Sequence, residues 1–334
     1  MLPLPAGYTT RTASLEDVEI AAQAGCEYAQ ATIGGQDLSA ENLYNQWQLP
    51  GFNPATDIYF VFSPQHKLVG YSGIWAIHKP PIHPWVWGLV DVQHQGLGLG
   101  THMLTWADRR LAQVIENVPV ELRFAPQAGT FSTIQPARQL LENNGWRQIR
   151  STYQMRIDLD SAPPAPQFPA NLTIRTFRAG DTETLYRAKQ EAFRDHFGFV
   201  PQPFDLFKQR LLGDPAFDAG LWFLAWAGDE LAGFCLGFKH SDDDPQAGFV
   251  VHLGVRRPWR KQGLGLALLR QAFGEFHRRG CPRATLGVDA ENLTGALRLY
   301  EKAGMYVNRC FDTFEKEIRL GAELSVQAIE EQTP

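Results

Sequence analysis

The 334-residue chain carries one pattern of glycines twice. Gly265 lies 165 residues after Gly100, and Gly304 lies 159 residues after Gly145. In each half, the first glycine separates an apolar run from an apolar-periodic run, and the second glycine closes a shorter periodic run. Two spacings this similar indicate a duplicated domain and exclude a solenoid, whose repeats are far shorter.

Apolar runs bounded by turn residues predict the elements of each half. In the first half we expect strands at residues 8–14, 58–62, 68–77, 85–92, 120–124 and 153–159, and helices at 15–32, 103–115 and 136–143. In the second half we expect strands at residues 172–178, 221–226, 231–237, 249–255 and 284–288, and helices at 181–193, 264–276 and 295–304. We therefore predict an α/β (α+β) fold with two tandem domains, each a twisted mixed sheet with flanking helices. The expected parts are residues 1–160, a proline-rich linker at 161–171, residues 172–320, and a tail at 321–334.

The segment after the expected strand at 249–255 carries the clearest chemical signal. It reads Arg-x-x-Gly263-x-Gly265 and leads directly into a helix. Glycines let the backbone approach a ligand closely, and the N–H groups and dipole of a helix N-terminus attract phosphate. The same turn carries four basic side chains, Arg256, Arg257, Arg260 and Lys261. The segment therefore predicts an anion-binding loop.

Two other phosphate loops are excluded. The Walker pattern needs Lys and then Ser or Thr after the second glycine, whereas Leu266 and Ala267 follow Gly265. The dinucleotide pattern needs a third glycine or alanine where this chain has Leu268.

The sequence downstream of the loop adds further elements in a fixed order. The expected strand at 284–288 ends in Asp-Ala-Glu-Asn292, and the next helix contains Leu-Tyr300 before Gly304-Met305. Strand, glycine loop, helix, strand with a following Asn, and helix with Tyr together resemble the GCN5-related N-acetyltransferase (GNAT) superfamily over residues 173–318.

This resemblance implies acetyl-CoA as the cosubstrate, no metal, and a primary amine of a small molecule or a peptide as the acceptor. It implies that catalysis belongs to the second half and that Tyr300 is the general acid. The residues that it places against coenzyme A are Val255, Arg260, Lys261, Gln262, Gly263, Leu264, Gly265 and Asn292. Backbone N–H groups near Val255 are the expected oxyanion donors.

The general base stays open at this stage. Many members of the superfamily carry a Glu six residues before the position of Val255, where this chain has Phe249. Strand alternation predicts that His252 points to the face opposite Phe249, so we expect a core histidine there. The remaining candidates are Glu291 with the nearby Asp289, and His196 with Asp195.

The first half differs where chemistry is expected. It keeps Gln95-x-x-Gly98-x-Gly100, but Asp91, Val92 and Gln95 stand in place of Arg256, Arg257 and Arg260. Leu141 aligns with Tyr300, and a longer stretch from 127 to 133 replaces Asn292. We expect a structural domain or a weak coenzyme A binder. A tandem with the better-equipped copy second resembles mycothiol synthases in architecture. The alternative function is a non-catalytic acyl-CoA-binding sensor.

Composition limits the partners. A net charge of −5 and a pI of about 6.0 argue against a nucleic-acid binder. No apolar run is long enough for a membrane span, and the N-terminus does not resemble a secretion signal. The four cysteines lack zinc spacing. We expect a cytoplasmic protein without metal or membrane partner, as a monomer or a homodimer.

Overall fold

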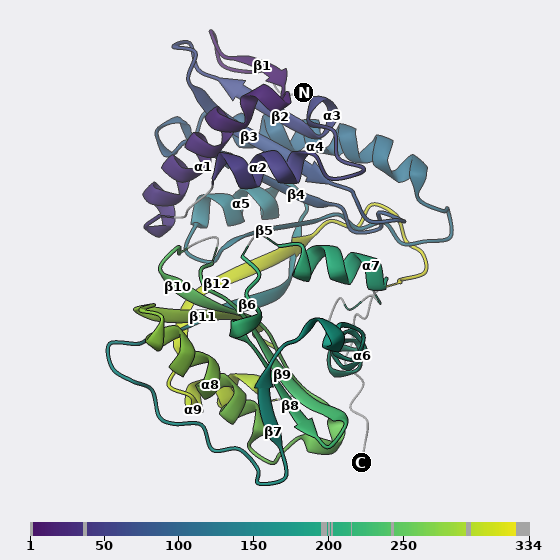
Figure 1. Cartoon of the computed structure of the whole chain (residues 1–334). Coiled ribbons are helices and arrows are strands. Elements are labelled where there is room, and N and C mark those ends of the chain that lie inside the picture. Colours follow the sequence, from purple (N-terminus) through teal and green to yellow (C-terminus); the bar gives the residue numbers. More distant parts are fainter. Residues whose placement is uncertain are drawn as a thin grey trace. The chain divides into compact units, whose positions relative to one another are not determined.

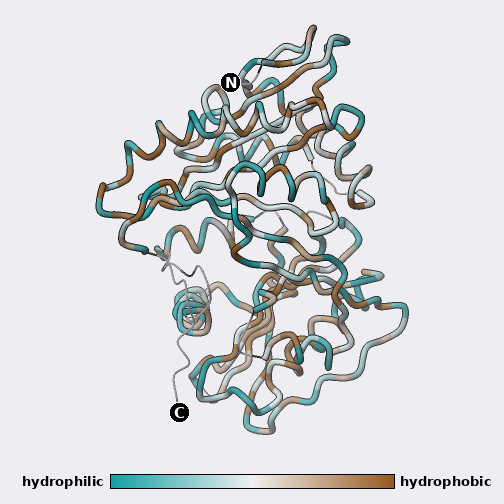
Figure 2. The backbone as a smooth tube through the Cα atoms, turned by 180° about the vertical axis from the view of Figure 1, so that it is seen from behind, coloured by the Kyte–Doolittle hydropathy of each residue, from teal (hydrophilic) through white to brown (hydrophobic). Residues whose placement is uncertain are grey.

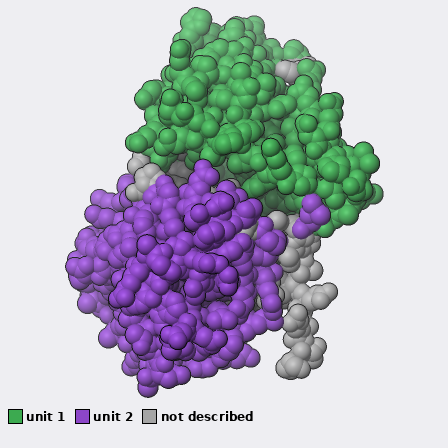
Figure 3. Space-filling view, turned by 45° about the vertical axis from the view of Figure 1, so that its right-hand side comes forward, with its two compact units in different colours: residues 1–151, 311–323 green, residues 152–310, 324–334 purple. Residues whose placement is uncertain are grey.

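The structure is a computed structural model that describes residues 3–35, 39–194, 199, 201, 203–214, 216–241, 244–291 and 295–324. The chain divides into two compact units (Figure 3). Unit 1 comprises Met1–Ser151 and Phe311–Glu323, and unit 2 comprises Thr152–Cys310 and Leu324–Pro334. Two strands, β6 (Arg147–Asp158) and β12 (Tyr306–Glu315), each have one part in either unit. Each unit is described by itself below.

Unit 1 contains a mixed sheet in the strand order β1-β2-β3-β4-β5, followed by its parts of β12 and β6 (Figure 1). The strands are β1 (Thr9–Thr12), β2 (Ile58–Phe62), β3 (Leu68–Trp75), β4 (Trp85–Val90) and β5 (Gln127–Phe131). The helices are α1 (Val18–Ile33), α2 (Ala40–Trp47), α3 (Pro54–Asp57), α4 (Leu99–Val114) and α5 (Gln135–Asn143). Neighbouring strands are antiparallel from β1 to β4, whereas β4 and β5 are parallel.

Unit 2 repeats this arrangement in the order β7-β8-β9-β10-β11, followed by its parts of β6 and β12. The strands are β7 (Thr173–Thr176), β8 (Trp222–Ala227), β9 (Glu230–Phe238), β10 (Ala247–Val255) and β11 (Arg283–Asp289). The helices are α6 (Thr182–Phe193), α7 (Phe204–Phe207), α8 (Leu264–Arg278) and α9 (Ala296–Lys302). Again the pairs are antiparallel up to a parallel pair, here β10 and β11. The predicted tandem of two mixed α/β sheets is therefore confirmed.

Helices cover both faces of each sheet because one stripe of each long helix is apolar. In α4, Leu99, Met103, Ala107 and Leu111 recur every four residues and are all buried. Figure 2 shows the corresponding alternation of hydrophobic and hydrophilic residues along the helices. No helix in the described ranges is long and apolar enough to cross a membrane.

The strand β9 shows which face belongs to which helix in unit 2. The ring of Phe234 stacks on Phe193 at the end of α6, with centroids 6.4 Å apart. A Cβ atom added at Gly233 would lie 3.3 Å from Leu268 of α8, and one at Gly237 would lie 2.9 Å from Phe276. From Gly233 to Phe238, even-numbered residues of β9 therefore face α6, and odd-numbered residues face α8.

The expected strand at residues 120–124 is wrong. Leu122 and Phe124 are buried but form only isolated bridges, to Ala322 and Arg319 of the segment Phe311–Glu323. The strand that pairs with β4 is β5, in the stretch 127–133, for which the sequence analysis predicted no strand. In this segment Leu122 and Phe124 are buried and alternate with Glu121 and Arg123, whereas Val120 is 82% exposed. Such alternation is typical of a strand, but it does not show that a neighbouring strand pairs with the segment.

An ion pair at the start of each unit repeats almost without change. In unit 1, Arg11 donates two hydrogen bonds to Asp17, and in unit 2 Arg175 donates two to Asp181, at 2.6–2.7 Å. The backbone N–H of Arg178 also donates to Asp181. The hydrogen bonds from Arg175 are the main reason that the pKa of Asp181 is lowered. This carboxylate joins the first strand of unit 2 to the first turn before α6.

We expect Asp181→Asn to lower the free energy of unfolding by about 1–3 kcal/mol at pH 7, because a buried charge-assisted pair is lost. A lowered carboxylate pKa stabilises the fold above the ordinary value of 3.8 and stops doing so as pH falls through the lower folded value. The difference between variant and wild type should therefore shrink as the pH falls below about 4. Urea unfolding at several pH values measures it, with Asp205→Asn, whose side chain is 91% exposed, as the matched control.

Candidate active site

The parallel pair in unit 2 opens before β10 ends. Pairing between β10 and β11 runs only from Ala247 with Arg283 to Val250 with Leu286. Residues 251–255 of β10 lie beyond the stretch that pairs with β11, while β9 pairs with residues 252–255 on the other side. A ligand with amide groups can form hydrogen bonds with the backbone of this open segment.

The open segment begins with a β-bulge. Val250 lies opposite Gly237 and His252 lies opposite Leu236, so Val251 is an extra residue on β10. Such a bulge interrupts the alternation of side chains and bends the strand away from its neighbour. It coincides with the point at which β10 and β11 separate.

The bulge decides how His252 and Phe249 are oriented relative to each other. Residues opposite one another in a sheet share a face. Phe249 lies opposite Phe238, and His252 lies opposite another even-numbered residue of β9, so both face α6. The imidazole meets the ring of Phe193 edge-on at 5.3 Å between centroids. The expectation that His252 and Phe249 point to opposite faces is wrong, because strict alternation does not hold across a bulge.

The predicted anion loop follows directly at the end of β10. Lys261 has a φ of 61° and Gly263 a φ of 81°, both left-handed, and α8 begins at Leu264. The first intrahelical bond runs from the N–H of Ala267 to the carbonyl of Gly263 at 3.1 Å. The N–H groups before it, including those of Leu264 and Gly265, have no acceptor within the helix. This geometry fits a pyrophosphate, as the sequence predicts.

Two of the basic side chains hold the loop in shape. Arg256 donates to Glu191 of α6 at 2.7 Å, and its guanidinium lies 5.1 Å from the ring centre of Trp259. Arg260 donates to the backbone carbonyl of Val255 at 3.0 Å. Further along the loop, Lys261 and Gln262 are exposed. The expectation that all four cations are available to phosphate therefore needs correction, because Arg256 already has a carboxylate partner.

Val255 is also the residue whose backbone N–H the sequence suggests as an oxyanion donor. The N–H of Arg256 donates to the carbonyl of Ala232 in β9, so the N–H of Val255 points the other way, to the open side. Its carbonyl on that side accepts from Arg260. An N–H aimed at a water-poor slot is a suitable oxyanion donor.

Tyr300 lies on α9, on the opposite face of the sheet from His252. It is 8% exposed, and its pKa is raised to about 12, first by burial and then by the nearby Cys235. Cys235 is odd-numbered in β9, faces α8, and lies opposite Leu253 of the open segment. Tyr300 therefore lies near the level at which β10 is open.

The other predicted residues have different outcomes. Glu291 is exposed and lies two residues beyond β11, where its N–H donates to Asp289 at 3.0 Å. Both this turn and the anion loop follow the carboxyl ends of parallel strands, so they lie at one edge of the sheet. His196 and Asn292 lie outside the described residues. Sequence reasoning missed Glu191 as the partner of Arg256, since nothing local indicates a contact across 65 residues.

Comparisons with known proteins agree with this geometry. Residues 182–305 match the model of the Acetyltransferase (GNAT) family. The mycothiol acetyltransferase of Streptomyces scabiei (strain 87.22) is 30% identical over 302 residues, which cover 88% of either chain. This chain belongs to the GNAT family.

Solved structures extend the likeness to the whole tandem. A GCN5-related N-acetyltransferase from Sphaerobacter thermophilus is 32% identical with a TM-score of 0.81, over 98% of this chain and 100% of that one. A tandem GNAT protein from the clavulanic acid biosynthesis pathway is 12% identical with a TM-score of 0.66, over 94% and 100%, and shows the fold alone. The protein is thus an N-acetyltransferase with two GNAT units. In its described residues, no group of three or more His, Cys, Asp or Glu side chains is placed to hold a metal ion.

In unit 1 the parallel strands β4 and β5 separate early, as β10 and β11 do in unit 2, but β4 has no bulge. β4 and β5 pair only at Trp85 with Gln127 and Val86 with Ala128, and β3 pairs along β4 without a bulge. Gly98 has a φ of 78° at the start of α4, and the side chain of Gln95 donates to the carbonyl of Val90 at 3.3 Å, as Arg260 does to Val255 in unit 2. The backbone of the site is kept, whereas the cationic side chains are not.

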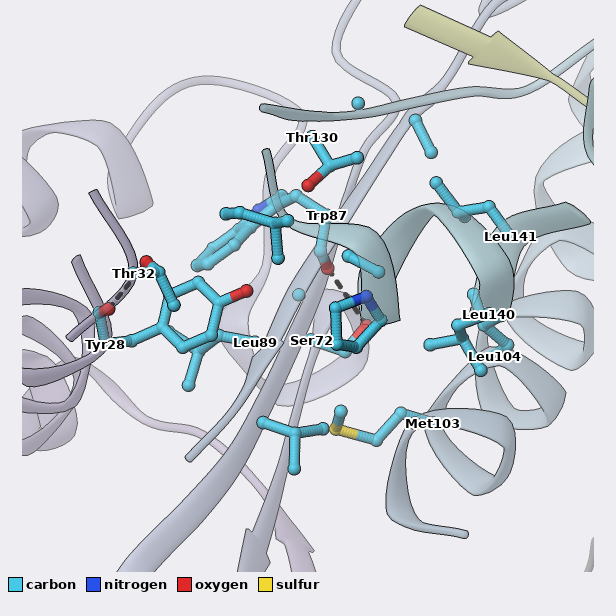
Figure 4. A pocket seen from close by; sticks show the side chains of 18 of the residues that line it. Tyr28, Thr32, Ser72, Trp87, Leu89, Met103, Leu104, Thr130, Leu140 and Leu141 are labelled. Carbon is cyan, nitrogen blue, oxygen red and sulfur yellow. Dashed lines mark hydrogen bonds between the residues drawn. The ribbon is translucent and has the colours of Figure 1, made fainter. Parts of the chain in front are cut away.

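A cavity of about 900 Å³ occupies this opening in unit 1. Figure 4 shows Tyr28, Thr32, Trp87 and Leu89 on one side of it, and Leu104, Leu140 and Leu141 on the other. Its described lining contains no Asp, Glu, Lys or Arg. Leu141, at the position of Tyr300, is 7% exposed, and its carbonyl accepts from Trp146 as that of Tyr300 accepts from Met305. The predicted equivalence of the two positions therefore agrees with the backbone contacts.

The two loops allow a matched test of acetyl-CoA binding in the full-length chain. Gly98 and Gly263 have the same left-handed φ, and a Cβ atom added at either would meet no atom within 4 Å, so Asp at either position meets the same backbone strain. Asp is also a favourable N-cap residue, but its charge repels phosphate. We expect Gly263→Asp to weaken the tighter acetyl-CoA site at least tenfold, about 1.4 kcal/mol. Gly98→Asp should change that site less than twofold. Calorimetry measures both, and an equal effect of the two substitutions would contradict the assignment.

Proposed function

We propose that unit 2 transfers the acetyl group of acetyl-CoA to a primary amine of a small molecule or a peptide. One observation carries the proposal. In unit 2, an open and bulged segment of β10 joins a left-handed anion loop and lies near Tyr300. In unit 1, the same backbone opening has a regular strand and Leu141 instead.

The loop and the open strand supply binding and orientation. The N–H groups at the start of α8 are aimed at a pyrophosphate, and Lys261 adds an exposed cation. The open edge of residues 251–255 suits the amides of the pantetheine arm. When bound, acetyl-CoA supplies an activated acyl group. The N–H of Val255 then stabilises the negative charge that develops on the acyl oxygen.

Tyr300 acts on the leaving sulfur. A pKa of about 12 keeps its hydroxyl protonated at neutral pH, so it is a donor. Complete proton transfer to a thiolate, whose conjugate acid has a pKa of about 8.5, is uphill by roughly 5 kcal/mol. We therefore propose that Tyr300 donates a hydrogen bond while the carbon–sulfur bond breaks and that water supplies the final proton. Glu291 at the strand edge and His196 remain candidate groups for acceptor binding or proton removal.

The class of the acceptor amine is proposed from the relatives of this chain and from the residue at position 249. The curated relatives named mycothiol acetyltransferase make a mycothiol-related amine one member of a test panel. Phe249 replaces the glutamate that the superfamily resemblance leads us to expect, so we propose the class of acceptor and not one compound.

A second candidate function is a non-catalytic acyl-CoA sensor. The cavity of about 900 Å³ in the unit that lacks the tyrosine favours it. Release of coenzyme A thiol from acetyl-CoA with a broad panel of amines separates the two functions. We expect amine-dependent thiol release. Binding of acetyl-CoA without turnover on any amine would favour the sensor.

We expect Tyr300→Phe to keep the acetyl-CoA affinity within about threefold and to lower kcat about 10–100-fold, because the hydroxyl acts mainly in the transition state. Leu141→Ala is the control at the equivalent buried position of unit 1. It should cost stability and leave the kcat of the folded protein unchanged. Steady-state kinetics and calorimetry check both variants. A rate equal to wild type for Tyr300→Phe under chemistry-limited conditions, or equal losses in both variants, would reject the role.

A further inference from the structure

We propose that His252 is the general base that removes a proton from the attacking amine. This inference rests on the proposed acetyl transfer in unit 2 and fills the position left vacant by Phe249. Its basis is a register shift in one strand.

Because of the bulge, His252 lies on the same face as Phe249, the position at which the superfamily resemblance leads us to expect a glutamate. Phe249 and His252 are three residues apart, which places them on opposite faces of a regular strand. With Val251 as the extra residue, both face α6. His252 also lies within the open segment, past the last residue of β10 that pairs with β11. It therefore lies beside the slot proposed for the thioester.

His252 and Tyr300 lie on opposite faces of the sheet at this opening. His252 is next to α6, as its contact with Phe193 shows, and Tyr300 is next to Cys235 on the face of α8. A base on one side and a donor on the other suit a displacement in which an amine enters from one face and a sulfur departs on the other. The open segment is the passage between them.

Unit 1 provides an internal comparison. Trp87 lies three residues before Val90, as His252 lies three residues before Val255. Trp87 packs on Tyr71 with ring centroids 4.3 Å apart, on the face covered by α1 and α2. The same face and position thus hold an imidazole in unit 2 and an indole in unit 1. The unit with Leu141 in place of the tyrosine has also lost the histidine, so the two proposed reactive groups are present or absent together.

The surroundings of His252 combine an apolar contact with nearby charges. The Nζ atom of Lys189 lies 5.7 Å from the ring centre of Phe193, the ring that contacts His252. The elements around this segment carry charged side chains: Glu183, Arg187, Lys189, Glu191 and Arg194 of α6 and its end, Arg256, Arg257, Arg260 and Lys261 after β10, and Asp289 and Glu291 at the end of β11 and after it. Arg256 and Glu191 neutralise each other at 2.7 Å. A neutral imidazole nitrogen can accept a proton from an ammonium group, and histidine is a common general base in enzymes.

The proton and electron balance of the step is simple. One proton of the ammonium moves to an imidazole nitrogen of His252. The nitrogen lone pair forms the new carbon–nitrogen bond while the carbonyl π pair moves onto oxygen, beside the N–H of Val255. When this pair returns, the carbon–sulfur bond breaks and its electrons leave with sulfur. The second amine proton reaches sulfur through water near Tyr300, and His252 releases its proton to solvent.

The test uses the full-length protein and two acceptor amines of different pKa at saturating acetyl-CoA. For wild type, kcat/KM should rise with pH to a plateau, with one midpoint shared by both amines because the base belongs to the enzyme. In His252→Gln, kcat/KM at pH 7 should fall about 100-fold, and the midpoint should follow the pKa of each amine. His252→Glu should recover part of the rate, with the midpoint shifted toward about 4.3. The control His240→Gln changes an exposed histidine of the same unit and should match wild type.

The outcomes separate this inference from the proposed function. A rate loss in His252→Gln with the wild-type pH profile indicates a structural role and overturns the inference alone. An unchanged rate also overturns it alone. Bound acetyl-CoA with no turnover of any amine by wild type overturns both. Calorimetry should show acetyl-CoA affinity within about threefold of wild type in His252→Gln, because a base for the amine does not hold the cosubstrate.

Discussion

The early end of pairing between two parallel strands is the constraint on which the site depends. β10 and β11 share hydrogen bonds only up to Val250 and Leu286, and β10 then runs on for five residues with one side open. Unpaired backbone groups inside a sheet are costly unless something else satisfies them. The side chain of Arg260 satisfies the carbonyl of Val255. The proposed pantetheine arm would add hydrogen bonds along the same open side. The proposed binding slot is thus the place where the two parallel strands separate.

The two units show which features belong to the shared backbone scaffold and which belong to the proposed chemistry. Both keep the strand opening, a left-handed glycine before the long helix, and the Arg–Asp pair that joins the first strand to the first turn. They differ in side chains that do not affect the backbone, such as Leu141 against Tyr300. Unit 1 also lacks the bulge. A duplicated scaffold therefore remains folded after its reactive groups are replaced by apolar ones, because the scaffold contacts are separate from them.

Loss of charge in unit 1 has a physical consequence. The loop keeps its N–H groups, but Gln95 replaces Arg260, and the lining of the cavity has no Lys or Arg among its described residues. Backbone dipoles alone attract phosphate less than dipoles combined with a cation. The cavity is nevertheless large, because β4 and β5 separate in the same way as their counterparts. Space and electrostatic attraction are thus independent properties of the two sites.

The sequence by itself determined the duplication, the anion loop and the tyrosine, because each depends on short-range patterns: glycine spacing, apolar periodicity, and one residue type at a helix position. The prediction of a strand at residues 120–124 was wrong because alternate burial, here of Leu122 and Phe124, does not require pairing with a neighbouring strand. Only the tertiary structure decided that Arg256 is held by Glu191 and that His252 faces α6. The first is a contact across 65 residues, and the second became visible from the register of β10 with β9, in which one extra residue places Phe249 on the same face as His252. Neither produces a pattern in the local sequence, because both depend on which helix or strand packs against the residue.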